Sequence, residues 1–218
     1  MSLSLAEENY LKAIYHLSED GTKDVLTNAL ADSLSTKAAS VTDMIKKLSV
    51  KNLISYKKYY GVNVTAKGKR QALQVIRKHR LWETFLVQKL DFAWDEVHEI
   101  AEQLEHIESP RLIEKLDKFL GYPTVDPHGD PIPNGKGKIV IKPQIPLDQI
   151  EEGYKGAIVA VKDSDSAFLK YLEKIGAKPG KKIQVISKEA YDESMEVIVG
   201  NQKVFISKEV SKNILVTE

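Results

Sequence analysis

The sequence predicts a mainly α-helical protein with a C-terminal β module, and the spacing of apolar residues and prolines supports this class. Apolar residues recur at helical spacing from the N-terminus to about residue 120, except in residues 54–65. Residues 122–147 hold six of the eight prolines, which predicts an extended segment without helices. From Leu147 onward, short β-branched runs are interrupted by one helical stretch near 166–176, a pattern typical of a small β-barrel.

The length of 218 residues allows two or three modules, and their boundaries are expected at 1–72, 73–146 and 147–218. Within the first module, helical spacing predicts three helices followed by a hairpin in residues 54–65. This is the order of a winged helix-turn-helix, whose second motif helix enters the major groove of double-stranded DNA. The hydroxyls of Ser35 and Thr36 are expected to cap that helix.

The charge distribution agrees with a DNA-binding first module. Residues 1–80 contain 14 Lys and Arg against 7 Asp and Glu, whereas residues 81–121 contain 4 against 10. The remainder is balanced, with 14 against 14, and the formal net charge of the whole chain is only +1. A basic first part and an acidic middle part indicate separate functions. The function expected of the basic part is binding to DNA phosphates.

Small and hydroxyl side chains at the start of the third helix suit close approach to base edges, and hairpin lysines suit phosphates. The candidate DNA-binding residues are Ser35, Thr36, Lys37, Ala38, Ala39, Ser40, Thr42, Lys57 and Lys58. This helix has no arginine, so the commonest guanine-reading contact is missing and backbone contacts are expected to dominate. An ordinary helical bundle with a basic surface is the alternative interpretation.

The stretch DEVHEIAEQLEHIES, residues 95–109, gathers imidazoles and carboxylates into one expected helix. On a helix, His98, Glu102, Glu105 and His106 share an arc of about 100°, opposite an apolar face. Such a face of nitrogen and oxygen ligands predicts a metal site. A solvated acidic face with two incidental histidines is the alternative.

A long helix is expected from about Ala66 to Leu90, with Thr65 as its cap. It carries His79 and Glu83 one turn apart. Four of the five histidines of the chain therefore lie in or near carboxylate clusters, which favours metal binding over the solvated face.

The composition also excludes several kinds of site. The chain has no cysteine, which rules out disulfides, thiolate metal sites and cysteine nucleophiles. No apolar run reaches membrane-spanning length, and the N-terminus lacks the pattern of a signal peptide. We therefore expect a cytoplasmic protein that does not associate with membranes.

Several motifs, in the correct order, make the sequence resemble the diphtheria toxin repressor family of metal-dependent transcriptional regulators. The motifs are LAEENYLKAIYHL, RKHRLWETFL, LDKFLGYPTVDPHGDPIP and HEIAEQLEH, the last of which matches the H-x3-E-x2-E-H spacing of the family's metal helix. Residues from about Leu147, AKPGKKIQV included, resemble the family's FeoA-like barrel. The resemblance covers essentially the whole chain. It implies a homodimer with a helical dimerisation domain that represses metal-uptake genes through a palindromic operator.

The family's primary metal site falls on Glu102, Glu105 and His106, with a ligand from the first helix at Asn9. Asn9 departs from the pattern, because iron sensors have Met and manganese sensors have Asp at this position. An amide oxygen can bind a hard cation, but more weakly than a carboxylate. Position 102 is Cys in the iron-sensing branch and Glu in the manganese-sensing branch, so Glu102 favours manganese.

The family's second metal site uses side chains of the long helix, the metal helix and the later chain. The matching positions are His79, Glu83, His98, Asp126, His128 and Asp163. Asp126 stands where relatives often have Cys. A lone Asp before a helix is also a common cap or turn residue, which is the alternative for Asp163.

The ligand types give an independent indication of the metal. Carboxylates and imidazoles without thiolate suit Mn²⁺ or Fe²⁺, whereas Zn²⁺ or Co²⁺ would bind at least as tightly in vitro. Affinity order in the test tube therefore does not identify the physiological metal.

Three other functions compete with a metal-dependent repressor. A metal-independent winged-helix regulator with structural histidines explains the basic first part but not the co-facial ligands. A metallohydrolase needs a second histidine four residues after His98, where the sequence has Glu102, so no enzyme activity is expected. A metal-transport accessory role for the C-terminal module leaves the DNA-binding part unexplained.

Overall fold

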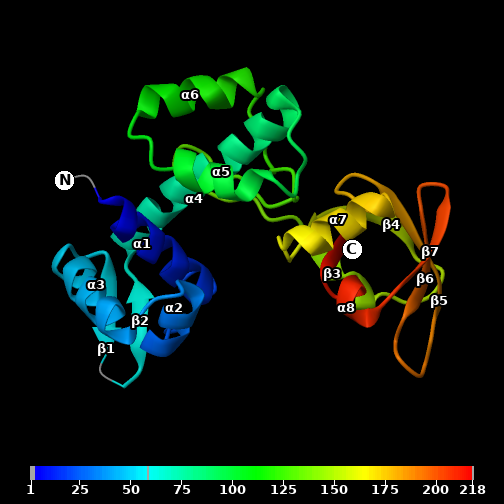
Figure 1. Ribbon diagram of the computed structural model, residues 1–218, viewed down its shortest axis with the longest axis horizontal. Coiled ribbons are helices and arrows are strands. Elements are labelled where there is room, and N and C mark those ends of the chain that lie inside the picture. The colour runs from blue at the N-terminus through cyan, green and yellow to red at the C-terminus, as the bar shows by residue number, and fades with distance from the viewer. Residues whose placement is uncertain (1–2, 58, 218) are drawn as a thin grey trace. The chain divides into compact units, whose positions relative to one another are not determined.

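The computed structural model describes residues 3–57 and 59–217 (Figure 1). Lys58, one of the candidate DNA contacts, lies outside the described residues. The chain divides into two compact units. Unit 1 comprises Met1–His79, Leu104–Glu108 and Pro133–Lys138, and unit 2 comprises Arg80–Gln103, Ser109–Ile132 and Ile139–Glu218.

Unit 1 contains the expected order of helices and a hairpin. Its elements are α1 (Leu5–Leu17), α2 (Thr27–Ser33), α3 (Ala38–Val50), β1 (Ile54–Lys57) and β2 (Gly61–Val64). One face of each helix supplies the core, in which Leu11, Ile14, Leu30 and Leu48 are fully buried. A winged helix-turn-helix arrangement follows from this burial and from the antiparallel pairing of β1 with β2.

The N-terminal caps of α1 and α3 differ. At α1, Ser4 and Glu7 form a reciprocal capping box, which satisfies two orphan backbone N–H groups. At α3, Lys37 occupies the N-cap position, and no side-chain hydrogen bond caps the helix within the described chain. The expected capping by Ser35 and Thr36 is therefore wrong. Both residues lie in the preceding turn, where Ser35 adopts a left-handed φ of 46°.

The hairpin depends on Gly61, the first residue of β2. Gly61 has a φ of +113°, and a Cβ there would lie 2.2 Å from the carbonyl oxygen of Val25. Val25 and Val62 exchange backbone hydrogen bonds at this point. The glycine therefore allows the hairpin to join the segment before α2.

Three helices follow, namely α4 (Ala66–Leu90), α5 (Val97–Leu104) and α6 (Pro110–Phe119). α4 has the expected bounds, and the hydroxyl of Thr65 accepts a hydrogen bond from the Gly68 N–H. α5 is shorter than expected, because Ser109 is extended before Pro110 and caps α6 instead. Glu105 and His106 consequently lie in the turn after α5.

The C-terminal part of unit 2 is a β module. Its strands are β3 (Gln144–Pro146), β4 (Lys155–Val161), β5 (Lys182–Lys188), β6 (Met195–Val199), β7 (Gln202–Ile206) and β8 (Ile214–Thr217). Its helical elements are η1 (Leu147–Gln149), α7 (Ser166–Lys174) and α8 (Lys208–Ser211).

The pairing of these strands is antiparallel, in the order β3-β8-β4-β5-β6-β7. Within the described chain β3 and β7 are edges that do not pair with each other, so the sheet is open rather than a closed barrel.

The core of the β module includes a residue from far outside it. Trp94, in the loop between α4 and α5, is buried in the same apolar cluster as Leu147, Leu172 and Val185. Val87 of α4 packs against this cluster. The β module and the helical part of unit 2 therefore share one core. None of the helices in the described ranges is both long and apolar enough to cross a membrane.

Replacement of Gly61 tests the close approach of the hairpin. Gly61→Ala should lower the free energy of unfolding by about 2 kcal/mol or more, because the new Cβ is both strained and in collision with Val25. Gly200→Ala is the matched control, since Gly200 has a φ of +60° but no neighbour within 4 Å of an added Cβ. Urea unfolding of both variants measures the difference. Equal losses would mean that the Val25 contact contributes nothing.

Candidate metal centre

Glu105 is the centre of a buried cluster in unit 1. Its side chain has no exposed surface, and the ammonium nitrogen of Lys12 lies 2.7 and 2.9 Å from its two carboxylate oxygens. His79 Nδ1 lies 2.6 Å from Oε2. Burial alone raises the pKa of Glu105, but the His79 hydrogen bond and the charge of Lys12 outweigh it and hold the pKa below its usual range.

His106, the neighbouring ligand candidate, is oriented by Glu8 of α1. His106 Nδ1 lies 2.6 Å from Glu8 Oε2, and Lys78 Nζ lies 3.5 Å from the other oxygen of Glu8. When a carboxylate accepts a hydrogen bond from one ring nitrogen, the other nitrogen is unprotonated and its lone pair is available. Metal-binding histidines are usually oriented in this way.

The second ring nitrogen of His106 supports this interpretation. His106 Nε2 and Asn9 Oδ1 are buried side-chain atoms of unit 1 with no hydrogen-bond partner in the part of the chain that the structure describes. A buried polar atom without a partner costs about 1–3 kcal/mol. Both atoms are electron-pair donors of the kind that a divalent cation accepts, so the residues present fit a metal ion.

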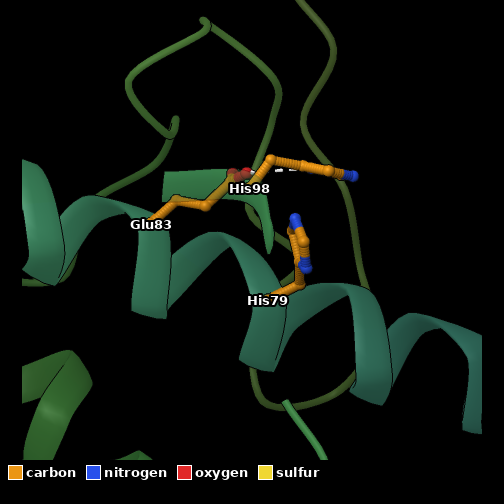
Figure 2. A group of neighbouring side chains, drawn as sticks. All are labelled: His79, Glu83 and His98. Carbon is orange, nitrogen blue, oxygen red and sulfur yellow. Dashed lines mark hydrogen bonds and ion pairs between the residues drawn. The ribbon is translucent and has the colours of Figure 1, made fainter. Parts of the chain in front are cut away.

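Glu102 belongs to unit 2 and lies on α5, three residues before Glu105. Its side chain is half-buried, and its Oε1 lies 3.8 Å from His98 Nε2. His98 in turn places Nδ1 3.4 Å from Glu83 Oε1. Figure 2 shows this pair, with His79 one turn before Glu83 on α4.

A second cluster lies entirely within unit 2. Glu83, Asp126 and His128 are buried, and their ligand atoms lie within 4.8 Å of one another. His128 Nδ1 is 3.7 Å from Glu83 Oε2, and Arg80 Nε is 3.5 Å from Asp126 Oδ2. Two carboxylates and an imidazole at this spacing form a candidate site for a hard or borderline cation.

The protonation of this cluster reflects its burial. Burial, followed by the charges of Asp130 and Glu83, raises the pKa of Asp126 to about 7. Burial alone lowers the pKa of His128, but the hydrogen bond and charge of Glu83 outweigh it and raise the pKa to about 8. Protons and a cation would therefore compete for the same atoms.

The loop that carries Asp126 and His128 is attached to β4. Asp126 Oδ1 accepts hydrogen bonds from the N–H groups of His128 and Asp130, which closes the loop. The carbonyl of His128 accepts from the N–H of Val161. A Cβ on Gly129, whose φ is +90°, would lie 2.0 Å from the carbonyl oxygen of Val159. Only glycine therefore allows this loop to lie so close to the strand.

Trp94 completes the surroundings of His128. The two rings stack with centroids 5.7 Å apart, and His128 Nε2 lies 2.8 Å from the carbonyl oxygen of Trp94. Because Trp94 is also part of the β-module core, the same residue fixes the histidine and anchors the module.

Asp163, the remaining expected ligand, lies between β4 and α7. Its side chain is half-buried, and its Oδ1 accepts a hydrogen bond from the N–H of Asp165, which caps α7. Among the described residues, Asp163 belongs to none of the groups of three or more ligand atoms within 4.8 Å. Its placement is thus that of a turn residue near one end of β4.

Most of the candidate DNA-binding residues in the described part of the chain are exposed. In α3, Val41, Ile45 and Leu48 are buried, which leaves the opposite face of the helix exposed. The exposed candidates are Ser35, Lys37, Ala38, Ala39, Ser40, Thr42 and Lys57, and Thr36 is half-buried. Lys57, at the end of β1, lies 3.9 Å from Asp24.

Three residues of these sites were missed by the sequence analysis, namely Glu8, Lys12 and Trp94. Glu8, Asn9 and Lys12 occupy one arc of α1, so helical spacing from Asn9 would have found the first two. Nothing local in the sequence marks Trp94, because its partners lie in a different module.

Comparison with known proteins gives three matching families along the chain. Residues 2–62 match the N-terminal DNA-binding domain of iron-dependent repressors, and residues 65–134 match their metal-binding and dimerisation domain. Residues 145–218 match the FeoA domain. The three matched stretches follow one another along the chain.

Individual relatives agree with these matches. The iron-dependent repressor IdeR of Mycobacterium leprae is 33% identical over 158 residues, which cover 71% of this chain and 68% of that protein. A solved manganese-dependent transcriptional repressor in complex with manganese is 33% identical, with a TM-score of 0.87 over 97% of this chain and 99% of that one. The manganese regulator SloR is 32% identical, with a TM-score of 0.75 over the full length of both chains.

The raised pKa of His128 predicts how the stability of the metal-free protein depends on pH. The stabilisation is fully present below the ordinary histidine pKa of 6.5 and is lost as the pH rises through about 8. Asp126 acts in the same direction at lower pH, between 3.8 and about 7. As the pH rises, the free energy of unfolding of His128→Gln should therefore fall by about 1–2 kcal/mol less than that of the wild type.

Thermal unfolding of chelator-treated protein from about pH 6 to about pH 9 measures this loss. His16→Gln replaces an exposed histidine of α1 and should keep the wild-type slope. If His128→Gln also kept that slope, the pKa of His128 would not be raised in the folded protein.

Proposed function

The chain belongs to the diphtheria toxin repressor family of metal-dependent transcriptional repressors, and we propose that it represses metal-uptake genes when Mn²⁺ binds next to α1 in unit 1. The observation that carries the proposal is that two side-chain atoms, Asn9 Oδ1 and His106 Nε2, are buried without a hydrogen-bond partner in the described chain, and that the second lies 3.7 Å from a carboxylate oxygen of the buried Glu105. These atoms belong to the same unit as the DNA-binding helices.

The proposed primary ligands in unit 1 are Asn9, Glu105 and His106, and the family resemblance alone adds Glu102. A cation held there supplies the positive charge that draws these donors together. Asn9 is part of α1, which packs in the core of the DNA-binding part, whereas Glu105 and His106 lie in the Leu104–Glu108 segment. Bound metal therefore favours DNA binding only if it binds the competent arrangement of these two segments better than any other.

Manganese is the metal we favour. The four proposed ligands offer oxygen and imidazole nitrogen without thiolate, which suits Mn²⁺ or Fe²⁺, and Glu102 matches the manganese-sensing branch. Zn²⁺ and Co²⁺ are expected to bind at least as tightly in vitro. The physiological metal then depends on which cation the cell makes available.

The proposed DNA contact is the exposed face at the start of α3. Ala38, Ala39 and Ser40 have small side chains that allow close approach to base edges, and Lys37 and Thr42 can donate hydrogen bonds. Lys57, and Lys58 from the sequence alone, are proposed phosphate contacts of the hairpin. Since phosphate contacts dominate, binding should weaken steeply with added salt.

The protein acts as a homodimer on a palindromic operator. In the helical part of unit 2, Leu90, Leu112, Phe119 and Tyr122 are exposed large apolar side chains, which one chain alone leaves in water. A two-fold dimer presents two recognition helices to half-sites about one DNA turn apart. We place the module boundaries at residues 72 and 146, and we expect a cytoplasmic protein without enzymatic activity.

The proposed second site is centred on the cluster in unit 2. Glu83, Asp126 and His128 supply ligand atoms within 4.8 Å, and the pair of His98 with Glu83 extends the group. His79 and Asp163 are further proposed ligands from the family resemblance. Metal here would replace the protons that the raised pKa values of Asp126 and His128 retain.

Metal dependence of DNA binding is the central test of the proposed function. Metal-free protein should bind operator DNA weakly, and buffered Mn²⁺ should increase affinity at least about tenfold. Glu105→Gln should lose most of that increase, because it removes the charge of the buried ligand. Fluorescence anisotropy with labelled operator measures both proteins. Equal affinity with chelator and with Mn²⁺ would favour the metal-independent regulator.

The contribution of Asp163 separates a ligand from a turn residue. If Asp163 ligates the second ion, Asp163→Ala should lose one Mn²⁺ in calorimetric titration and most of the metal-induced rise in melting temperature. His128→Gln serves as the reference for loss of the second site. Wild-type stoichiometry in Asp163→Ala would assign it only the hydrogen bond to Asp165.

A further inference from the structure

We propose that Lys12 is a built-in cation that neutralises Glu105 in the metal-free protein and thereby raises the metal concentration needed to fill the primary site. The inference rests on the proposed metal site, and it concerns how that site is regulated rather than which residues ligate. It predicts that the ammonium group of Lys12 alone determines the metal concentration at which the primary site fills.

The geometry of α1 brings Lys12 to the site. Glu8, Asn9 and Lys12 share one face of the helix, and this face supplies the contacts to Glu105 and His106. The side chain of Lys12 is 14% exposed, so its ammonium is largely removed from water. It contacts both oxygens of Glu105, at 2.7 and 2.9 Å.

Charge balance explains why an ammonium is needed here. Without metal, the carboxylates of Glu8 and Glu105 face the ammonium groups of Lys78 and Lys12, respectively. Without Lys12, only the contact with His79 would compensate the fully buried Glu105, and removal of one partner of a buried ion pair is strongly destabilising. A divalent ion adds two positive charges to a cluster that Lys12 and Lys78 have already neutralised.

Metal binding at Glu105 therefore competes with Lys12. Either the ammonium leaves the carboxylate, or it stays and repels the ion from a few ångströms away, and both outcomes weaken metal affinity. The flexible four-carbon stem of lysine permits the first outcome, because the side chain is not fully enclosed and its ammonium can rotate towards water. The second cluster differs, since the cation beside Asp126 is the guanidinium of Arg80 at 3.5 Å.

Lys12→Met tests this competition, because it keeps the apolar stem and removes the charge. The variant should bind Mn²⁺ about tenfold more tightly or better, measured by isothermal calorimetry. It should also melt at a lower temperature without metal, and Mn²⁺ should raise that temperature by more than in the wild type. Lys12→Arg keeps the charge and should retain wild-type affinity.

Lys51→Met is the matched control for loss of a buried ion pair. Lys51 lies 2.7 Å from the buried Glu7 in the same unit, but Glu7 is not a proposed ligand. This control should lower the melting temperature and leave Mn²⁺ affinity unchanged. Unchanged or weaker Mn²⁺ affinity in Lys12→Met would overturn the proposal, because a purely structural lysine predicts that result.

Two further measurements keep the test decisive. If Lys12→Met does not fold without metal, Lys12→Gln replaces it, since glutamine can still donate a hydrogen bond to Glu105. Folding of either variant only in Mn²⁺ supports the proposal, whereas failure to fold even in saturating Mn²⁺ overturns it. Glu105→Gln, measured alongside, separates the two hypotheses: normal Mn²⁺ binding in Glu105→Gln would refute the primary site itself.

Discussion

The burial of one carboxylate determines much of the arrangement of unit 1. Glu105 has no exposed surface, and an ion so buried is tolerated only when opposite charge and hydrogen bonds compensate for the lost water. α1 supplies that compensation through Lys12 and α4 through His79. Three segments that are far apart in the sequence are therefore held together by the requirements of a single group.

The two clusters solve the same electrostatic problem differently. In unit 1 a lysine neutralises the carboxylate, whose pKa stays below its usual range. In unit 2 burial, followed by the charges of neighbouring carboxylates, raises the pKa of Asp126 to about 7. On the proposed function, a cation at the first site would compete with the ammonium of Lys12, whereas a cation at the second would compete with protons. The occupancy of the second site is thus expected to respond more strongly to pH.

The sequence predicted the elements that local signals specify. The bounds of α4 followed from the Thr65 cap and its apolar spacing, and strands β4 to β8 followed from their β-branched runs. β3 was not predicted, because it lies in the proline-rich segment. The cap of α3 and the length of α5 were wrong, because a left-handed turn at Ser35 and a new cap at Ser109 replaced the expected signals. The absence of pairing between β3 and β7 in the described chain depends on long-range geometry that no local pattern encodes.

For the candidate sites, ligand-type residues were easier to predict than the groups that control them. Residue type marked Glu105 and His106 as ligands, although both lie in the turn after α5 and not on the helix face that periodicity predicted. Lys12 was overlooked because an ammonium group is not a metal ligand. The attachment of the His128 loop to β4 through Gly129 was equally invisible, and it makes the β module inseparable from the second site. A chain cut in the linker before β3 would lose the strand that supports the loop and would leave Trp94 without its core. Transfer of the β module to another protein would likewise have to include Trp94 and residues 126–130. The part of the chain that must be kept together is therefore larger than the sheet.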